Sequence, residues 1–457
     1  MIVESGFADD VLADLSRLGL IAVEPGVEGD RVRLLEPDLR LFLKLLSSFS
    51  PRLVPMTRPG CPVHFCTGLL KSSETDANEV PAAGAPIPAG GQGDIASIAA
   101  ISCIGELSER LTLCSIGISD NRIFNYDKKQ PQVDFGRLLG LSEAQASVAL
   151  GRLRLGRDLS RVNSSDWSSL SDRRVRLRNL QTDEEAQCLS LGILFNEADD
   201  VTGLRLPFAS SAGCAVWHDL EGARARALLE LVERDAVAQA WYNRLGITSL
   251  PEGYVREMLP PDLVQYLDDQ PREWELLHVD TDLPVQVVIC VSHDVYGRGC
   301  AFGSSAGWDT AQACTSAIQE MLQSENALSL MDKSYPASHG TKEALRSLPR
   351  QLAYARERVI FEDLPLQGAV ATRPEVLEKT STFESLLQGC FDREISLWEF
   401  DATRQDLAIP CIKLLSPELC SWEPRFGKKR LFDGVVERGL RDIPASEAEF
   451  AARPFPF

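Results

Sequence analysis

The sequence has a shortage of positive charge and lacks any long apolar run. Lys and Arg together number 47 against 66 Asp and Glu, which gives a net charge of −19. Nucleic acids and anionic membranes both attract clustered Lys and Arg, so we expect neither as a partner. No stretch approaches the roughly 18 apolar residues of a membrane span, and the acidic N-terminus is unlike a secretion signal. We therefore expect a cytoplasmic protein.

Several common site patterns are also missing. The twelve Cys and five His show no spacing typical of zinc ligands or of a disulfide framework. Most Cys stand among apolar residues, as Cys290 does, and this predicts reduced, buried thiols. The chain has no Walker A motif, no kinase glycine-rich loop with its lysine and no Gly-x-Ser-x-Gly elbow. These absences exclude the usual nucleotide-binding loops and a serine hydrolase of that type.

The chain is long enough for a large core and divides into regions of different character. Residues 1–60 predict a small N-terminal docking module, with a helix at 9–18, a strand pair at 20–23 and 31–35, and a second helix at 36–46. Residues 61–457 predict the catalytic domain. Residues 71–93 are rich in Ala, Pro and Gly, and we expect no regular element at 81–93. The segment is either a linker or a backbone-rich loop near a phosphate.

The pattern E-x-x-E-R occurs twice, each time in an apolar and apparently helical segment. The residues are Glu106, Glu109 and Arg110 in the first copy, and Glu230, Glu233 and Arg234 in the second. Residues three apart share one face of a helix, so each copy sets two carboxylates side by side. Such pairs are costly to bury unless a cation neutralises them, and hard oxygen ligands suit Mg²⁺. Ordinary surface ion pairs are the alternative.

An order of small residues followed by a helix repeats three times. Segments 90–93, 210–215 and 303–307 are rich in Gly, Ser and Ala, and each precedes a long helix; the third helix carries Glu320 and Gln323. This predicts an α/β (α+β) fold with internal pseudo-repeats. Carboxylates from three helices meeting at one point would bind more than one Mg²⁺, and hence a polyphosphate, whose oxygens the loop N–H groups would hold. The residues alone therefore predict a nucleoside triphosphate site.

These segments together resemble the YcaO family, over roughly residues 85–457. Residues 102–110 are similar to the family's S-x-x-x-E-x-x-E-R, 210–215 and 227–235 to its S-N-G-x-A loop and A-L-x-E-x-x-E-R-D helix, and 317–324 to its A-L-x-E-x-x-Q-S. Residues 416–433 and the proline-rich end at 452–457 resemble the azoline-forming branch. The resemblance implies a YcaO-like fold and an ATP-dependent cyclodehydratase.

That activity would convert Cys, Ser or Thr of a ribosomally made peptide, such as a bacteriocin precursor, to thiazoline or oxazoline. The side chain attacks the preceding carbonyl, ATP phosphorylates the resulting oxyanion, and phosphate leaves. The resemblance implies Mg²⁺ ligands at Glu106, Glu109, Glu230 and Glu233. It implies ATP contacts at Ser102, Glu106, Glu109, Arg110, Ser211, Glu230, Glu233, Arg234, Glu320 and Gln323. It also implies a catalytic tail of Pro454, Pro456 and Phe457, whose terminal carboxylate would orient or deprotonate the attacking group.

The implied partners are the precursor peptide, a separate leader-binding protein and a flavin-dependent dehydrogenase, in a homodimer or multi-subunit complex. Three positions depart from the family pattern: Gln92 replaces a Lys, and Ser316 and Glu325 replace Arg residues. Positive charge that would face phosphate is therefore missing. Two alternatives stay open, a thioamide-forming YcaO enzyme and a non-catalytic YcaO-like scaffold.

Overall fold

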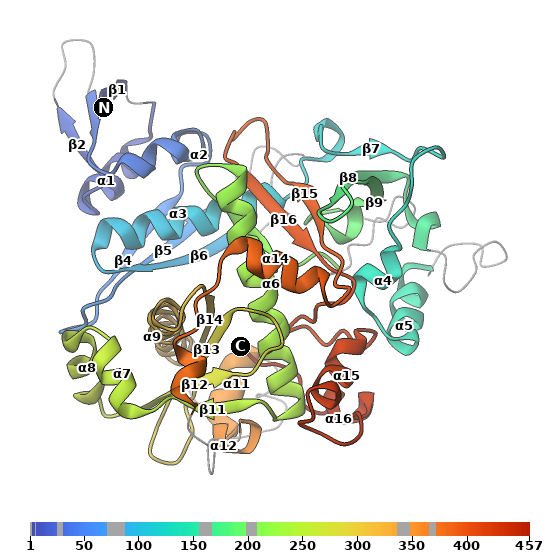
Figure 1. Cartoon of the computed structure of the whole chain (residues 1–457). Helices are drawn as coiled ribbons and strands as arrows, with labels where there is room; N and C mark the ends of the chain where they lie inside the picture. Colours follow the sequence, from blue (N-terminus) through green and yellow to red (C-terminus); the bar gives the residue numbers. More distant parts are fainter. Residues whose placement is uncertain are drawn as a thin grey trace. The chain divides into compact units, whose positions relative to one another are not determined.

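The chain forms two compact units in the computed structural model (Figure 1). The structure describes residues 2–4, 6–24, 31–70, 87–154, 167–197, 208–335, 348–364 and 372–457. The first unit comprises Met1–Arg58, Val63–Leu228 and Ser396–Pro417, and the second comprises Pro59–Pro62, Leu229–Ile395 and Glu418–Phe457. The functional division at residue 60 into a docking module and a catalytic domain stays a prediction.

The first unit begins with a three-stranded antiparallel sheet and short helices. The elements are β1 (Ile2–Glu4), α1 (Asp9–Arg17), β2 (Ile21–Glu24), β3 (Arg31–Leu34) and α2 (Leu43–Phe49), with strand order β1-β3-β2. The predicted first helix and strand pair are confirmed. The strand β1 was missed because three residues carry no readable periodicity. The predicted helix at 36–46 is instead a 3₁₀ segment, Pro37–Phe42, followed by α2.

A second sheet of the first unit supports the helix that carries the first acidic pair. Strands β4 (Arg52–Met56), β5 (His64–Leu70) and β6 (Ile87–Gly93) pair in that order, and α3 (Ala96–Leu113) packs on β5 and β6 (Figure 1). The expectation of no regular element at 81–93 is wrong for β6. A Cβ atom on Gly91 would lie 2.2 Å from the Cys103 nitrogen, so glycine serves close strand–helix packing here rather than a loop. Residues 71–86 lie outside the described residues.

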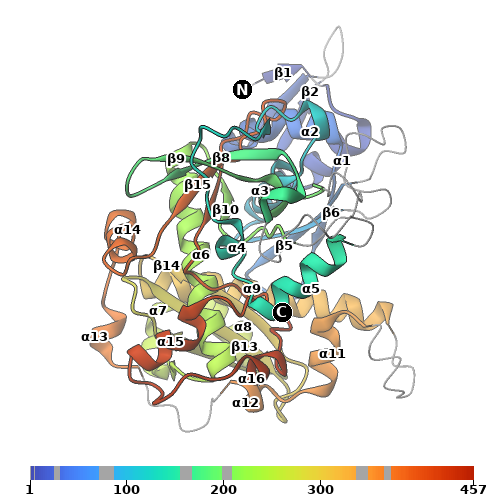
Figure 2. The same ribbon diagram turned by 90° about the vertical axis from the view of Figure 1, so that its right-hand side faces the viewer.

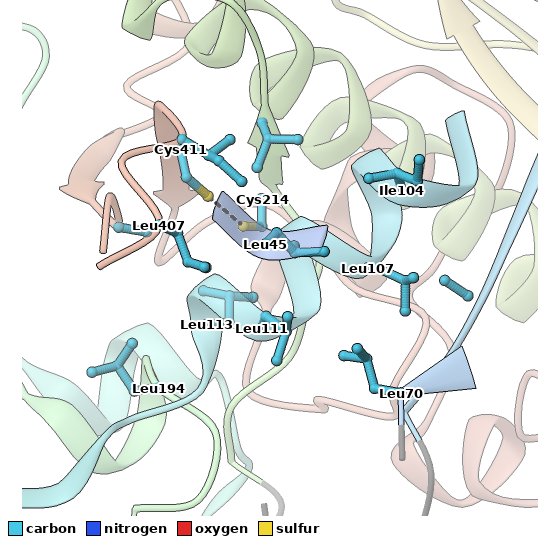
Figure 3. Close-up of a cluster of buried hydrophobic side chains, with 14 of the residues drawn as sticks. Leu45, Leu70, Ile104, Leu107, Leu111, Leu113, Leu194, Cys214, Leu407 and Cys411 are labelled. Atoms are coloured by element: carbon cyan, nitrogen blue, oxygen red, sulfur yellow. Dashed lines mark hydrogen bonds between the residues drawn. The ribbon is translucent and has the colours of Figure 1, made fainter. Parts of the chain in front are cut away.

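The third sheet of the first unit has the strand order β10-β16-β15-β8-β7, with β9 added beside β8. Its members are β7 (Phe124–Asn125), β8 (Arg173–Asn179), β9 (Glu185–Leu189), β10 (Cys214–Val216), β15 (Trp398–Asp401) and β16 (Cys411–Leu415), and α4 (Phe135–Leu139) and α5 (Glu143–Arg154) complete the unit. In its core, leucines of α3 lie near Cys214 and Cys411, whose sulfur atoms are 3.6 Å apart (Figure 3). Eleven of the twelve cysteines are buried, as predicted, and Cys61 is partly exposed; the reduced state stays a prediction.

The second unit is built on the antiparallel sheet β11-β12-β13-β14. Its strands are β11 (Ile247–Ser249), β12 (Glu273–Val279), β13 (Gln286–His293) and β14 (Ala301–Gly307). The helices are α7 (Glu252–Met258), α8 (Pro261–Asp268), α9 (Thr310–Ser334), α11 (Arg350–Glu357), α12 (Ile360–Asp363), α13 (Pro374–Leu377), α14 (Phe383–Phe391), α15 (Lys429–Glu437) and α16 (Glu447–Ala451). Helix α9 packs on β13 and β14 (Figure 2). A Cβ atom on Gly303 of β14 would lie 2.3 Å from α9 backbone atoms.

The predicted repeat of a small-residue segment and a helix is present as strand–helix pairs. Strand β6 leads to α3, β10 leads to α6 (Leu220–Asn243), and β14 leads to α9. Segments that we expected to be loops are therefore largely strands, because glycine and serine let a helix backbone approach a strand closely. The mixed α/β class is confirmed. Within the described residues, no helix has the length and apolar character that crossing a bilayer requires.

Candidate functional site

The first acidic pair lies on the partly exposed face of α3. The opposite face, with residues such as Ile104, Leu107 and Leu111, is buried. Glu106 accepts a 2.7 Å hydrogen bond from the Gly90 N–H of β6 and pairs with Arg110 one turn later. Glu109 accepts a 3.2 Å hydrogen bond from the Val216 N–H of β10. Both carboxylates are thus held by strand backbone.

The second acidic pair lies in the second unit, where α9 adds another carboxylate. Ser304 of β14 joins them: its hydroxyl donates a 2.7 Å hydrogen bond to Glu233, and its N–H donates a 3.3 Å bond to Glu320. Arg234 pairs with Glu230 at 3.1 Å. The structure therefore brings together the predicted residues of α6 and α9.

Burial perturbs the acids of this cluster. Desolvation raises the pKa of Glu233 to about 7, with a smaller contribution from repulsion by Glu230. It raises the pKa of Glu320 to about 8, and repulsion by Glu233 adds to that shift. Arg234 opposes the shifts and its own pKa is raised by the surrounding carboxylates, although desolvation acts against this. A divalent cation bound beside two such carboxyls would stabilise their ionised forms, so the cluster is suited to bind one.

Arg234 is fixed by an aromatic ring as well as by the acids. Its guanidinium carbon lies 3.5 Å from the ring centroid of Trp422, an arrangement that stabilises the cation. The next residue, Asp235, is fully buried and binds Arg430 at 2.8 Å. Asp235 therefore anchors α6 structurally and is not available to a ligand.

The proline-rich tail packs into an aromatic cluster of the second unit. Phe455 is 4% exposed, and its ring centroid lies 4.6 Å from that of Trp422. Phe457 stacks on Phe302 at 4.7 Å and contacts Tyr354. Trp422 thus touches both Arg234 and the tail. The catalytic role of Pro454, Pro456 and the Phe457 carboxylate stays a prediction.

The remaining predicted contacts differ in their surroundings. Ser102 is exposed on α3. Ser211 is exposed in the turn before β10, where its carbonyl accepts from the Cys214 N–H and Gly213 takes φ +72°. The Gln323 side-chain oxygen is buried, and no described residue donates to it. ATP contacts at these three residues stay predictions.

Magnesium ligation also stays a prediction. Within the described part of the chain, no three His, Cys, Asp or Glu side chains are grouped closely enough to hold a metal ion. Mg²⁺ usually takes one or two carboxylates and completes its shell with water and substrate phosphate. The paired carboxylates of this chain suit that mode of binding.

The three departures from the family pattern have separate surroundings. Gln92 is part of β6, and Ser316 is partly buried on α9. Glu325 pairs with Arg272 at 2.9 Å, so it takes part in an internal ion pair. None of the three supplies a cation.

Sequence reasoning missed two residues beside the acids. Ser304 binds both Glu233 and Glu320, and its place in the small-residue segment before α9 was the available signal. Arg226 lies one turn before Glu230 on α6, and that i, i+4 spacing would have identified it.

Three solved structures similar to this chain are a heterocyclase, a microcin synthetase complex and a YcaO protein. A heterocyclase in complex with substrate and cofactor has a TM-score of 0.70 and 20% identity, over 89% of this chain and 54% of the other. The E. coli microcin synthetase McbBCD complex has a TM-score of 0.56 and 15% identity, over 89% of this chain and 96% of the other. YcaO from Methanopyrus kandleri bound with AMPPCP and Mg²⁺ has a TM-score of 0.55 and 15% identity, over 86% of this chain and 89% of the other. This chain thus spans about half of the first heterocyclase.

A comparison with curated proteins gave no match. The comparison with protein families matched residues 90–420, more than half of the chain, to the family described as YcaO cyclodehydratase, ATP- and Mg²⁺-binding. That description confirms the predicted cofactors, ATP and Mg²⁺, at the level of the family. With its repeated acidic helices in a matching fold, the chain belongs to the YcaO family.

Proposed function

We propose that this chain is an ATP-dependent cyclodehydratase that forms thiazoline or oxazoline from Cys, Ser or Thr of a ribosomally made precursor peptide. The observation that carries the proposal is the Glu233–Ser304–Glu320 arrangement, in which burial makes two carboxyls resist ionisation although Arg234 acts against it. The family description supplies the matching ligands, ATP and Mg²⁺.

The proposed roles follow from the contacts. Glu106, Glu109, Glu230 and Glu233 would provide carboxylate oxygens for Mg²⁺. Ser304 holds two acids in place, and Arg234 offsets part of their charge. Bound ATP would supply the phosphoryl group that makes the amide oxygen a leaving group. The side-chain hydroxyl or thiol of the peptide would attack the preceding carbonyl carbon.

We also propose that substrate recognition needs a partner protein. This chain spans 54% of the heterocyclase that was solved with its substrate, and another similar structure is a multi-subunit synthetase complex. A leader-binding subunit would recognise the precursor peptide, and a flavin-dependent dehydrogenase would oxidise the rings. A cytoplasmic location remains part of the proposal.

In the direct test, the purified chain and its leader-binding partner are incubated with precursor peptide, ATP and Mg²⁺. Peptide products should be lighter by one water for each ring, with phosphate released in equal amount. Omission of Mg²⁺ should abolish both signals, and the variant Glu233→Gln should reduce both by on the order of 100-fold. Exchange of a peptide oxygen for sulfur would contradict the proposal and favour the thioamide reaction.

A further inference from the structure

Arg226 differs from the other arginines beside the acidic pairs. Arg110 pairs with Glu106 and Arg234 pairs with Glu230. Arg226 forms no ion pair or hydrogen bond with any residue that the structure describes, and its side chain is exposed. Its positive charge is therefore available to a ligand.

Trp217 fixes the guanidinium of Arg226 without using its donors. The Arg226 Cζ atom lies 3.1 Å from the ring centroid of Trp217. The ring itself packs closely on α6, since a Cβ atom on Gly222 would lie 2.0 Å from the Trp217 Cδ1 atom. Stacking uses the flat face of a guanidinium and leaves the N–H groups at its edge free. A fixed fork of free donors is suited to phosphate oxygens.

Arg226 also lies close to the acids assigned to Mg²⁺. It precedes Glu230 by four residues on α6, so the two share one helix face. Glu109 attracts it electrostatically, as does Asp219, without forming an ion pair. Desolvation of part of the side chain lowers the pKa of Arg226, yet an arginine stays cationic in proteins. The chain thus has a free cation beside carboxylates, as a metal–polyphosphate ligand requires.

We propose that Arg226 binds a phosphate group of ATP. It would supply positive charge that the family pattern leads one to expect at Gln92, Ser316 and Glu325. The inference rests on the proposed function, because it assigns the residue to the same ATP. Trp217 would act as a positioning residue, because it contacts the guanidinium of Arg226 and would not itself bind the phosphate.

The test is calorimetric titration of the full-length protein with Mg²⁺–ATP, Mg²⁺–tripolyphosphate and adenosine. Arg226→Gln should weaken the binding of both polyphosphates about 10- to 100-fold, the usual range for a lost charge-assisted hydrogen bond. Adenosine binding should not change. Arg226→Lys should recover part of the loss, since it restores charge but not the fork. Trp217→Leu should give a smaller loss and leave adenosine binding unchanged.

Arg176 offers a matched control, because it pairs with Glu185 at the surface of the same unit. Arg176→Gln should bind all three probes as the wild type does. Unchanged polyphosphate affinity in Arg226→Gln would overturn the inference and leave the proposed function standing. An equal loss for adenosine would also overturn it, by showing a structural role. If the wild type bound neither polyphosphate, the proposed function would fall together with the inference.

Discussion

The two E-x-x-E-R helices have the same local chemistry and different surroundings. In each, the first Glu pairs with the Arg one turn later, and the second accepts a hydrogen bond from a neighbouring strand. On α3 the paired side chains of Arg110 and Glu106 are 37% and 31% exposed. On α6 the matching pair, Arg234 and Glu230, is 26% and 27% exposed. Glu233 of α6 is only 8% exposed, and it repels Glu320 of α9.

This difference shows that the motif sets the spacing of the carboxylates, while burial sets the free energy needed to keep them ionised. A five-residue pattern can place two carboxylates side by side on any helix. Only a neighbouring acid and loss of solvent raise a carboxyl pKa toward neutrality. The buried copy therefore stores unfavourable energy that a bound cation can release, as functional sites often do.

The largest expected effect concerns the glycines that bring a strand against α3 and against α9, the helix that carries Glu320. Gly91→Ala and Gly303→Ala should each lower the free energy of unfolding by about 3 kcal/mol or more, because the new Cβ would meet helix backbone at 2.2–2.3 Å. Chemical denaturation measures this. Gly253→Ala is the control, since it has open space. A mild effect at only one site would mean that the two strand–helix pairs are not equivalent.

The next prediction asks whether both copies are needed for activity. Glu109→Gln and Glu233→Gln should each reduce ring formation by on the order of 100-fold, since each would remove charge from the proposed metal ligands. Product mass and phosphate release give the rates. Glu185→Gln, at an exposed surface pair, should stay fully active. Full activity in Glu109→Gln would restrict the metal site to the buried copy.

A third prediction uses pH to separate the copies in the ligand-free protein. The pKa of Glu233 rises from an ordinary 4.5 to about 7 and that of Glu320 to about 8. The folded state therefore binds more protons than the unfolded state above pH 4.5, and stability falls as pH rises toward 8. Glu233→Gln should remove part of that fall, on the order of 2 kcal/mol at pH 8. It should have little effect at pH 4.5.

Denaturation at several pH values would measure this slope. The control is Glu106→Gln on α3, which is expected to keep the wild-type slope because it lies outside the Glu233–Glu320 pair. A slope that Glu233→Gln leaves unchanged would show that the pair is not strained in the ligand-free protein.

The smallest expected effect is at the exposed ion pair of α3. Arg110→Gln should change the free energy of unfolding by about 0.5 kcal/mol or less, as is usual for exposed i, i+4 pairs. Arg234→Gln should lower the free energy of unfolding several times more than Arg110→Gln does. It leaves buried acids without their cation and removes the stack on Trp422. Equal effects of the two variants would show that burial does not distinguish the copies.

Much of the architecture could be predicted from periodicity and small-residue segments. The first helix, the N-terminal strand pair and the three long helices that follow small-residue segments agree with local patterns. The strand at 87–93 could not be predicted, because Gly and Pro usually mark loops and only close contact with α3 makes glycine favourable there. Ser304 and Arg226 were missed because their importance comes from neighbours far away in the sequence or across an aromatic ring.

The sequence by itself determined the acidic pairs, since helical spacing places residues three apart on one face whatever lies around them. It also determined the family, through motifs spread over most of the chain. Only the tertiary structure decided which acids are strained, which arginine is free and where the tail packs. The reason is physical: pKa shifts, ion pairs and aromatic stacking depend on distance and solvent exclusion, and folding creates both.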